Sequence, residues 1–376
     1  MLRTRLLSLV VLAVAAGALV EADEVIIKGK EKEKPLKGKV TKESPKEITL
    51  APAKEPIPTE SIADIVYEFP PGGASIAYNA AVKAEQASLD PTKEKDRAAK
   101  LKEAIDKYEE AFALPALTDK NLKRHVEYKV LMLRVRHVQE DDAKDPKLIA
   151  KLVDFAKKNP TAWQIINVCQ TLGRMQIDAG DYEGAEDSYS KLAKIPGLSD
   201  DARLDATMLA IQAKIQGGKF EEARSDIAEL QKDLPKGSRF QAKAQVAEAE
   251  CLVAETKKLA KDDAKRAKLF AQATDLVRGV IKESSDKYVK AVGHNTLGYV
   301  YQEQGQTKDA VWEFLWVDVV YNQDRVQHAK ALYHLWDLFS KDGDAPRAQE
   351  CRETLMSPQF AGLEYQRLVQ KESKAP

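Results

Sequence analysis

The five histidines are the side chains in this sequence most suited to metal binding or acid–base chemistry, but their spacing argues against both. They fall in different helix-like stretches or at spacings that do not suit a metal-binding pair, and no His-Glu-x-x-His or Cys-x-x-Cys motif occurs: His125, His137, His294, His328 and His334. A zinc site needs several such ligands that converge on one ion. We therefore expect these histidines to pack or to face solvent, and we expect no metal and no cofactor.

Motifs for nucleophilic catalysis and nucleotide binding are also missing. The sequence has no Gly-x-Ser-x-Gly turn, no P-loop and no dinucleotide-binding glycine turn. The segment Gly217-Gly218-Lys219 resembles a phosphate loop only superficially. Carboxylates are plentiful but are mixed with basic residues, as in residues 221–224, which is typical of solvated helix surface. The sequence predicts no catalytic residue, so we expect the protein not to be an enzyme.

The charge balance argues against a polyanionic partner. The chain has 59 basic and 59 acidic residues, and removal of the first 22 residues leaves 57 and 58. A near-neutral protein has no overall field that would attract DNA or RNA. We therefore expect no nucleic-acid partner.

The first 22 residues predict export. Arg3 and Arg5 precede a 15-residue apolar run from Leu6 to Val20, and small residues precede a cleavage point before Asp23. A membrane-spanning helix needs roughly 20 apolar residues, so we expect cleavage, with retention as an anchor as the alternative. After cleavage we expect no stable membrane span. The predicted location is the periplasm or cell envelope, or outside the cell.

The three cysteines do not form a disulfide framework. Cys169, Cys251 and Cys351 are odd in number and widely spaced, each within a stretch that is predicted to be helical. We expect small buried apolar side chains, although one pair across neighbouring helices stays possible.

Residues 23–69 differ from the rest because they are rich in short β-prone runs. These runs are separated by prolines, which favour strand edges and turns: Glu24–Ile27, Gly38–Thr41, Glu47–Leu50, Ile57 and Ile65–Tyr67. The strand spacing resembles a small SH3-like or Sm-like β-module. So few residues bury little surface alone, so we expect the module to pack against the first helices. Pro70-Pro71-Gly72-Gly73 marks its end.

From Ser75 onward, apolar residues and alanines recur at three- and four-residue spacing, with Gly or Pro between runs, which predicts successive helices. Four segments share one frame. In each, a residue of the first run is followed after seven residues by a turn glycine, and after five more by an alanine. The sets are Gly173, Gly180 and Ala185; Ile211, Gly218 and Ala223; Gly298, Gly305 and Ala310; and Trp336, Gly343 and Ala348.

These segments resemble tetratricopeptide (TPR) repeats, whose signature is W-x2-L-G-x2-Y, then A-x3-F and then P. Leu172-Gly173, Leu297-Gly298-x-x-Tyr301 and Ala310-x3-Phe314 carry the match. Together with the predicted signal segment, the resemblance is to TPR proteins of the exported bacterial type. The small residue of the first helix and the alanine of the second are expected to let the helices approach closely. Ile211 and Trp336 replace that small residue, so those two hairpins are expected to splay or shift.

The predicted fold class is all-α, a TPR-like α-solenoid of about seven helical hairpins preceded by the small β-module. Three further hairpins carry weaker signals: 75–88 with 93–114, 122–139 with 146–158, and 238–259 with 262–283. The predicted organisation is a signal peptide at 1–22, the β-module at 23–69, the repeat array at 75–358, and a C-terminal capping helix and tail at 359–376.

The resemblance also implies a binding site. In TPR proteins the first helix of each hairpin lines a concave groove, and its outward positions contact a peptide or protein ligand. By motif position these are Asn167, Gln170, Arg174, Met208, Gln212, Asn295, Tyr299, Gln302, Tyr333 and Asp337. The set is rich in amide and aromatic side chains, which hydrogen-bond and stack. It lacks the Lys/Asn/Arg pattern of TPR domains that clamp a C-terminal carboxylate.

An aromatic cluster near the C-terminus allows two interpretations. Trp312 and Trp316 lie four residues apart and share a helix face, near Tyr321, Tyr333 and Trp336. Core filling is one interpretation, and an exposed docking patch is the other. We interpret the protein as a non-enzymatic scaffold that binds a peptide or protein partner in the cell envelope. The alternatives are an envelope enzyme whose site is not visible in the sequence, placed where the β-module meets the helices, and a glycan-binding protein.

Overall fold

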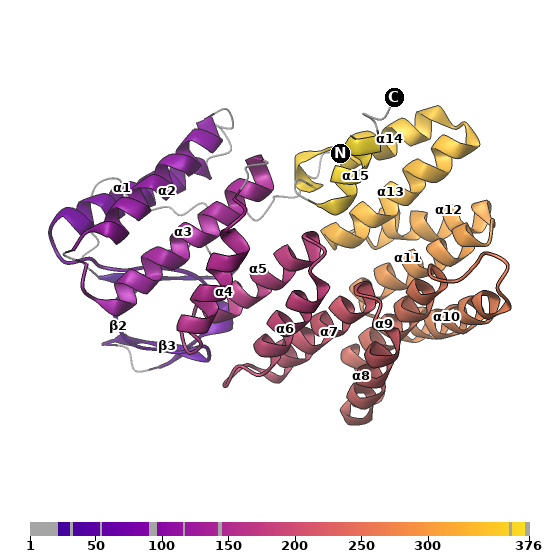
Figure 1. Cartoon of the computed structure of the whole chain (residues 1–376), viewed down its shortest axis with the longest axis horizontal. Helices are drawn as coiled ribbons and strands as arrows, with labels where there is room; N and C mark the ends of the chain where they lie inside the picture. Colours follow the sequence, from indigo (N-terminus) through magenta and orange to yellow (C-terminus); the bar gives the residue numbers. More distant parts are fainter. Residues whose placement is uncertain are drawn as a thin grey trace. The chain divides into compact units, whose positions relative to one another are not determined.

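The computed structural model describes residues 22–30, 33–52, 55–89, 96–115, 117–141, 145–360 and 363–372 (Figure 1). The predicted signal segment lies outside these ranges, apart from residue 22. The described chain forms a five-stranded sheet followed by fifteen α-helices. It divides into two compact units. One extends to Leu172 and includes Lys194–Asp200, and the other comprises Gly173–Ala193 and the chain from Asp201 onward.

The sheet is antiparallel and has the strand order β4-β3-β2-β1-β5. A 3-10 turn, η1 (Thr59–Ser61), lies between the last two strands. Five antiparallel strands agree with the predicted small β-module. Buried Val25 pairs with Ile65, and Val40 pairs with Leu50, so alternate residues supply an apolar face. The strands are β1 (Asp23–Ile27), β2 (Leu36–Glu43), β3 (Glu47–Ala51), β4 (Ile57–Pro58) and β5 (Ile62–Val66).

The module packs on the helices of its own unit, as its small size requires. The Tyr67 hydroxyl donates to Glu43 at 2.8 Å and accepts from Trp163 Nε1 at 3.1 Å. Arg124 forms an ion pair with Glu43. The helices of this unit are α1 (Gly73–Ser88), α2 (Arg97–Ala113), α3 (Lys120–Asp141) and α4 (Leu148–Lys158), and α5 (Ile165–Asp178) begins in it.

The second unit is built from consecutive helical hairpins that share cores with their neighbours. Ile211 and Ala223 pack with Ala244 and Ala247, and the next core joins Leu252 to Leu297. The helices are α6 (Tyr182–Ala193), α7 (Asp200–Gln216), α8 (Phe220–Asp233), α9 (Arg239–Thr256), α10 (Ala264–Glu283), α11 (Lys287–Glu303), α12 (Thr307–Leu315), α13 (Arg325–Asp342), α14 (Ala345–Leu355) and α15 (Glu364–Glu372). Seven helix pairs and a final helix in the described chain confirm the predicted array of about seven hairpins.

The predicted turn glycines all adopt the left-handed conformation that reverses the chain. Gly180, Gly218, Gly305 and Gly343 have φ between 75° and 79°. At Gly343 this conformation caps the end of α13, where its N–H donates to the carbonyl of Ser340. The glycine frame in the sequence therefore marks where each first helix ends.

The small residues of the first helices face aromatic rings of the second helices. A Cβ atom added to Gly173 would lie 2.5 Å from Tyr189 Cζ, and one added to Gly298 would lie 2.7 Å from Phe314 Cε1. In the second repeat, Ile211 packs in one core with Ile227, which occupies the position of those rings. A larger residue on the first helix thus faces a smaller one on the second, in place of the glycine–ring contact of the other repeats.

All three cysteines are buried, and none of them forms a disulfide. In the described part of the chain, no helix is long and apolar enough to cross a membrane.

Candidate functional site

Four of the predicted binding residues lie together on the first helices α11 and α13. Gln302 Nε2 donates to Asp337 Oδ2 at 3.0 Å, and Lys341 Nζ donates to the same oxygen at 2.7 Å. Tyr299 and Tyr333 flank these residues and are half-buried. We call Tyr299, Gln302, Tyr333 and Asp337 the first-helix face. The hydrogen bond between neighbouring hairpins fixes the spacing of its polar groups, while its aromatic rings stay partly accessible.

The electrostatic surroundings of this face are mixed. Lys257 Nζ lies 4.9 Å from the centre of the Tyr299 ring, which is a cation–π distance. Burial raises the pKa of the Tyr299 hydroxyl, and Glu303 adds to that rise, so the hydroxyl stays a hydrogen-bond donor at neutral pH. His334 lies edge-on to both Tyr299 and Tyr333. Burial lowers the pKa of His334 to about 3, and nearby lysines contribute, so it is neutral at physiological pH.

Asn295 differs from its predicted position because it does not face outward. Its side chain is fully buried, and Nδ2 donates to both the carbonyl and Oε1 of Gln327 in α13, each at 3.0 Å. Glu250 of α9 and Lys330 of α13 form an ion pair at 3.7 Å, so the two helices that flank α11 are joined there. The centre of α11 is therefore an interhelical contact, and a ligand does not reach Asn295.

The remaining predicted residues lie on α5 and α7. Asn167, Gln170 and Arg174 are exposed, and Asn167 Nδ2 donates to the Tyr128 hydroxyl at 2.6 Å. Met208 is half-buried against the core that contains Ile211, and Gln212 is half-buried beside it. Because α5 is divided between the two units, Asn167 and Gln170 are not placed relative to the face on α11 and α13.

The aromatic cluster divides into a buried part and an exposed part. Tyr321, Tyr333 and Trp336 pack partly against the last core. Trp312 and Trp316 are 67% and 46% exposed, and Val319, in the π-helical turn η3 (Trp316–Val320) that follows α12, is 68% exposed. We call Trp312, Trp316 and Val319 the α12 patch. Apolar side chains this exposed and adjacent are unusual on the surface of a soluble protein.

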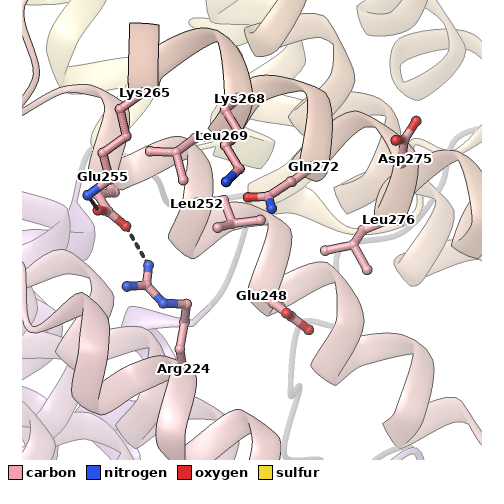
Figure 2. A pocket seen from close by; sticks show the side chains of 10 residues that line it. All are labelled: Arg224, Glu248, Leu252, Glu255, Lys265, Lys268, Leu269, Gln272, Asp275 and Leu276. Atoms are coloured by element: carbon pink, nitrogen blue, oxygen red, sulfur yellow. Dashed lines mark hydrogen bonds and ion pairs between the residues drawn. The ribbon is translucent and has the colours of Figure 1, made fainter. Parts of the chain in front are cut away.

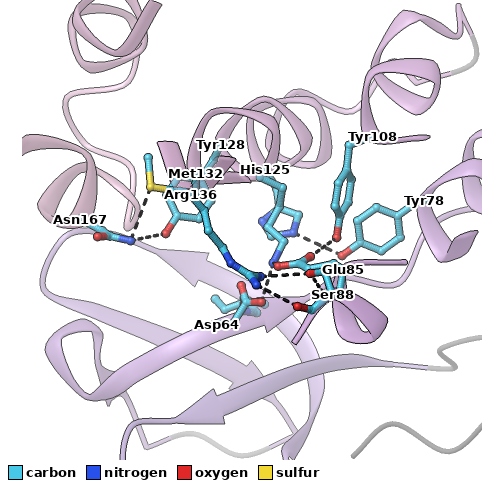
Figure 3. A network of polar contacts seen from close by, with 12 residues as sticks. Asp64, Tyr78, Glu85, Ser88, Tyr108, His125, Tyr128, Met132, Arg136 and Asn167 are labelled. Atoms are coloured by element: carbon cyan, nitrogen blue, oxygen red, sulfur yellow. Dashed lines mark hydrogen bonds and ion pairs between the residues drawn. The ribbon is translucent and has the colours of Figure 1, made fainter. Parts of the chain in front are cut away.

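A buried polar network lies where the β-module meets the helices, and Figure 3 shows Asp64, Glu85 and Tyr108 within it. Its central residue is Lys129, which the sequence analysis did not identify. Lys129 Nζ pairs with Asp64 Oδ2 at 2.8 Å and with Glu85 Oε1 at 2.7 Å. The Tyr108 hydroxyl donates to Glu85 at 2.7 Å. Burial opposes the charge on Lys129, but the two carboxylates outweigh it and raise its pKa. The lysine falls between apolar residues of α3, and that position was the only signal in the sequence.

This network has no room for a substrate. The adjoining cavity, lined by Asp64, Tyr78, Glu85 and Lys129 among others, measures about 10 Å³, which is the space of a single water. Burial lowers the pKa of His125 and raises that of Tyr78, so both stay neutral. The network therefore holds β5, α1 and α3 together. The titratable groups therefore cluster where the β-module meets the helices, the place of the alternative enzyme site, but no cleft beside them could admit a substrate.

A larger cavity, about 640 Å³ in volume, lies between α8, α9 and α10 (Figure 2). Leu252, Leu269 and Leu276 form its apolar surface. Charged residues line its two ends, and Gln272 lies between them: Arg224, Glu255, Lys265 and Lys268 on one side, Glu248 and Asp275 on the other. We call this cavity the α8–α10 groove. One face of α10 carries a signal of this groove in the sequence, which the sequence analysis did not use: Lys265, Lys268, Gln272 and Asp275 follow one another at three- and four-residue spacing.

No group of three His, Cys, Asp or Glu side chains that could hold a metal ion occurs among the described residues. The repeated pairing of helices, with left-handed glycine turns and facing small and aromatic residues, decides the architecture. The fold is a small β-module followed along the chain by a TPR-like helical array.

Comparisons with known proteins find only distant structural similarity. No protein-family model and no curated protein matches the chain. A tetratricopeptide repeat protein from Parabacteroides merdae is 12% identical, with a TM-score of 0.49, over 78% of this chain and 97% of that one. A Rap protein complexed with competence and sporulation factor is 13% identical, with a TM-score of 0.43, over 79% of each chain. Yeast Tom70 is 12% identical, with a TM-score of 0.39, over 80% of this chain and 63% of its own. At these values no function is transferred to this chain.

Proposed function

We propose that this protein is an exported, non-enzymatic scaffold of the cell envelope that binds a peptide or protein partner in a concave groove lined by its first helices. The observation that carries the proposal is the first-helix face, where two half-buried tyrosines flank a glutamine and an aspartate whose positions are fixed by a hydrogen bond. Such groups hydrogen-bond a peptide backbone and stack on its side chains. Export is supported by residues 1–22, a positive start followed by a short apolar run.

Site-specific photo-crosslinking in the native envelope tests this function. A photoreactive residue replaces Gln302 or Gln212, which lie on predicted ligand-facing positions, and a matched one replaces Lys232, which is exposed on α8. We expect the same identified partner to crosslink from both first-helix positions and not from position 232. Equal yields from all three positions, or no crosslink from 302 and 212, would rule out binding in the groove.

A second candidate function is glycan binding, which the α12 patch favours. Trp312 and Trp316 are exposed and one helical turn apart, so their rings are available to stack on sugar rings. On a glycan array we expect binding that is lost in Trp312→Ala and Trp316→Ala. The control is Val319→Ala, which removes apolar area from the same patch without removing a ring. Loss of binding in all three variants would indicate a general apolar contact.

A further inference from the structure

The α8–α10 groove has opposite charges at its two ends. Arg224 and Lys265 pair with the one carboxylate, Glu255, and Lys268 adds a third cation, so basic groups exceed acidic groups at this end. Figure 2 shows Glu248 and Asp275 at the other end, with Leu252 between the two groups. The groove is therefore electrically polarised along its length, although its total charge is zero.

The groups at each end differ in how far they are already neutralised. Glu255 accepts from Lys265 at 2.7 Å and also pairs with Arg224, and these contacts hold its pKa below the usual value although burial opposes that shift. Lys268 and Asp275 are exposed, and neither forms an ion pair with any residue that the structure describes. These two side chains are thus available to charged groups of a ligand.

The spacing of Lys268 and Asp275 along α10 favours a helical ligand. Lys268 and Asp275 are seven residues apart on α10, which corresponds to about 10 Å along a helix. In an extended segment, side chains on one face recur every two residues, at about 7 and 14 Å. Neither of these spacings equals the spacing of Lys268 and Asp275. A helical ligand places residues i, i+3, i+4 and i+7 on one face, and its residues i and i+7 lie about 10 Å apart.

We propose that the α8–α10 groove binds an amphipathic helix of a partner protein. The helix presents an acidic side chain to Lys268, apolar side chains to the leucines, and a basic side chain, two turns from the acid, to Asp275. The cavity measures about 640 Å³, which leaves room for such apolar side chains. The groove is lined by residues other than those of the first-helix face, so this site is separate from the one in the proposed function.

Binding of synthetic helical peptides to the intact chain tests the inference. Hydrocarbon-stapled, fluorescein-labelled peptides carry an acid at i and a base at i+7, with Leu, Ile, Phe or Met varied at i+3 and i+4. Matched sets carry two acids or two bases. By fluorescence anisotropy at low salt, we expect the acid–base set to bind at least fivefold more tightly than either matched set. No binding up to millimolar concentration, or equal binding of the three sets, would overturn the proposal.

The double variant Lys268→Glu/Asp275→Lys supplies the matched control. It brings both ends to zero net charge while changing only two exposed side chains, so the fold is retained and the fivefold preference is expected to disappear. Lys232→Ala, at an exposed position of α8 that does not line the groove, is expected to leave peptide binding unchanged. A preference that survives the double variant places the peptide elsewhere. Sedimentation that shows a dimer of the chain, dissociated by the double variant, would assign the groove to a second copy and overturn the partner-helix proposal.

Discussion

His334 stacks against Phe314, with ring centres 4.8 Å apart and planes 5° apart. Burial, with help from Lys330, Lys257 and Lys341, lowers its pKa from 6.5 to about 3. In the unfolded chain the ring takes up a proton below about pH 6.5, while in the folded chain it stays neutral. Its contribution to stability is therefore complete above pH 6.5 and is lost as the pH falls toward 3, at up to about 1.4 kcal/mol per pH unit.

The variant His334→Phe keeps a stacked ring and removes this titration. We expect it to lose less stability between pH 6.5 and 4.5 than the parent chain does. Urea unfolding followed by tryptophan fluorescence measures the difference, because Trp312, Trp316 and Trp336 all lie in the last hairpins. Parallel stability curves for the two proteins over this pH range would show that His334 does not titrate as its surroundings imply.

Lys129 is a second single residue on which stability is expected to depend. Its side chain is only 9% exposed and forms ion pairs with two carboxylates. In Lys129→Met, Asp64 and Glu85 would face each other without a cation, and we expect a loss of about 3–5 kcal/mol in unfolding free energy. The control is Lys100→Met, which breaks an exposed ion pair with Glu103 and is expected to leave the unfolding free energy almost unchanged. Denaturant titrations of the two variants, compared with the parent, measure both effects.

At the scale of elements, the contact between first and second helices depends on the absence of a side chain at Gly298. In Gly298→Ala the new methyl would lie 2.7–2.9 Å from three atoms of the Phe314 ring, so we expect destabilisation of about 1–3 kcal/mol, although alanine favours helix more than glycine does. Gly279→Ala, in α10, is the matched control, because no atom lies within 4 Å of its added Cβ. That variant is expected to gain about 0.5–1 kcal/mol. Thermal unfolding followed by circular dichroism compares the two glycine variants. A smaller side chain in Phe314→Leu, added to Gly298→Ala, is expected to restore part of the lost stability.

The same contact explains which elements could be predicted. Helix ends followed from the turn glycines, because a positive φ is a local requirement that glycine meets. The pairing of Ile211 with Ile227 was not predicted, because it depends on which side chains meet across two helices. Asn295 shows a similar limit: its place in the repeat frame was assigned correctly to a first helix, but its burial depends on Gln327 in the next one. A frame derived from one helix at a time does not contain such contacts.

At the scale of the whole molecule, sequence reasoning established the array and the module but missed the polar sites that several elements build jointly. Lys129 meets partners from β5 and α1, which lie 65 and 44 residues away in the sequence. The α8–α10 groove likewise combines residues from three helices. No short motif marks either site, since each partner alone is an ordinary lysine or carboxylate in a chain rich in both.

Repeat arrays are stabilised mainly by contacts between neighbouring elements, so damage is expected to stay near its origin. In Lys129→Met we expect faster amide hydrogen exchange in β5, α1 and α3, the elements joined by that lysine, and unchanged exchange in α11–α14. In Gly298→Ala we expect the reverse, with faster exchange in α11, α12 and α13, because Phe314 belongs to the core that these helices share. Hydrogen exchange measured by mass spectrometry on both variants decides the point. If either substitution raised exchange evenly along the chain, the two compact units would unfold as one cooperative body, and the nearest-neighbour account of their stability would be wrong.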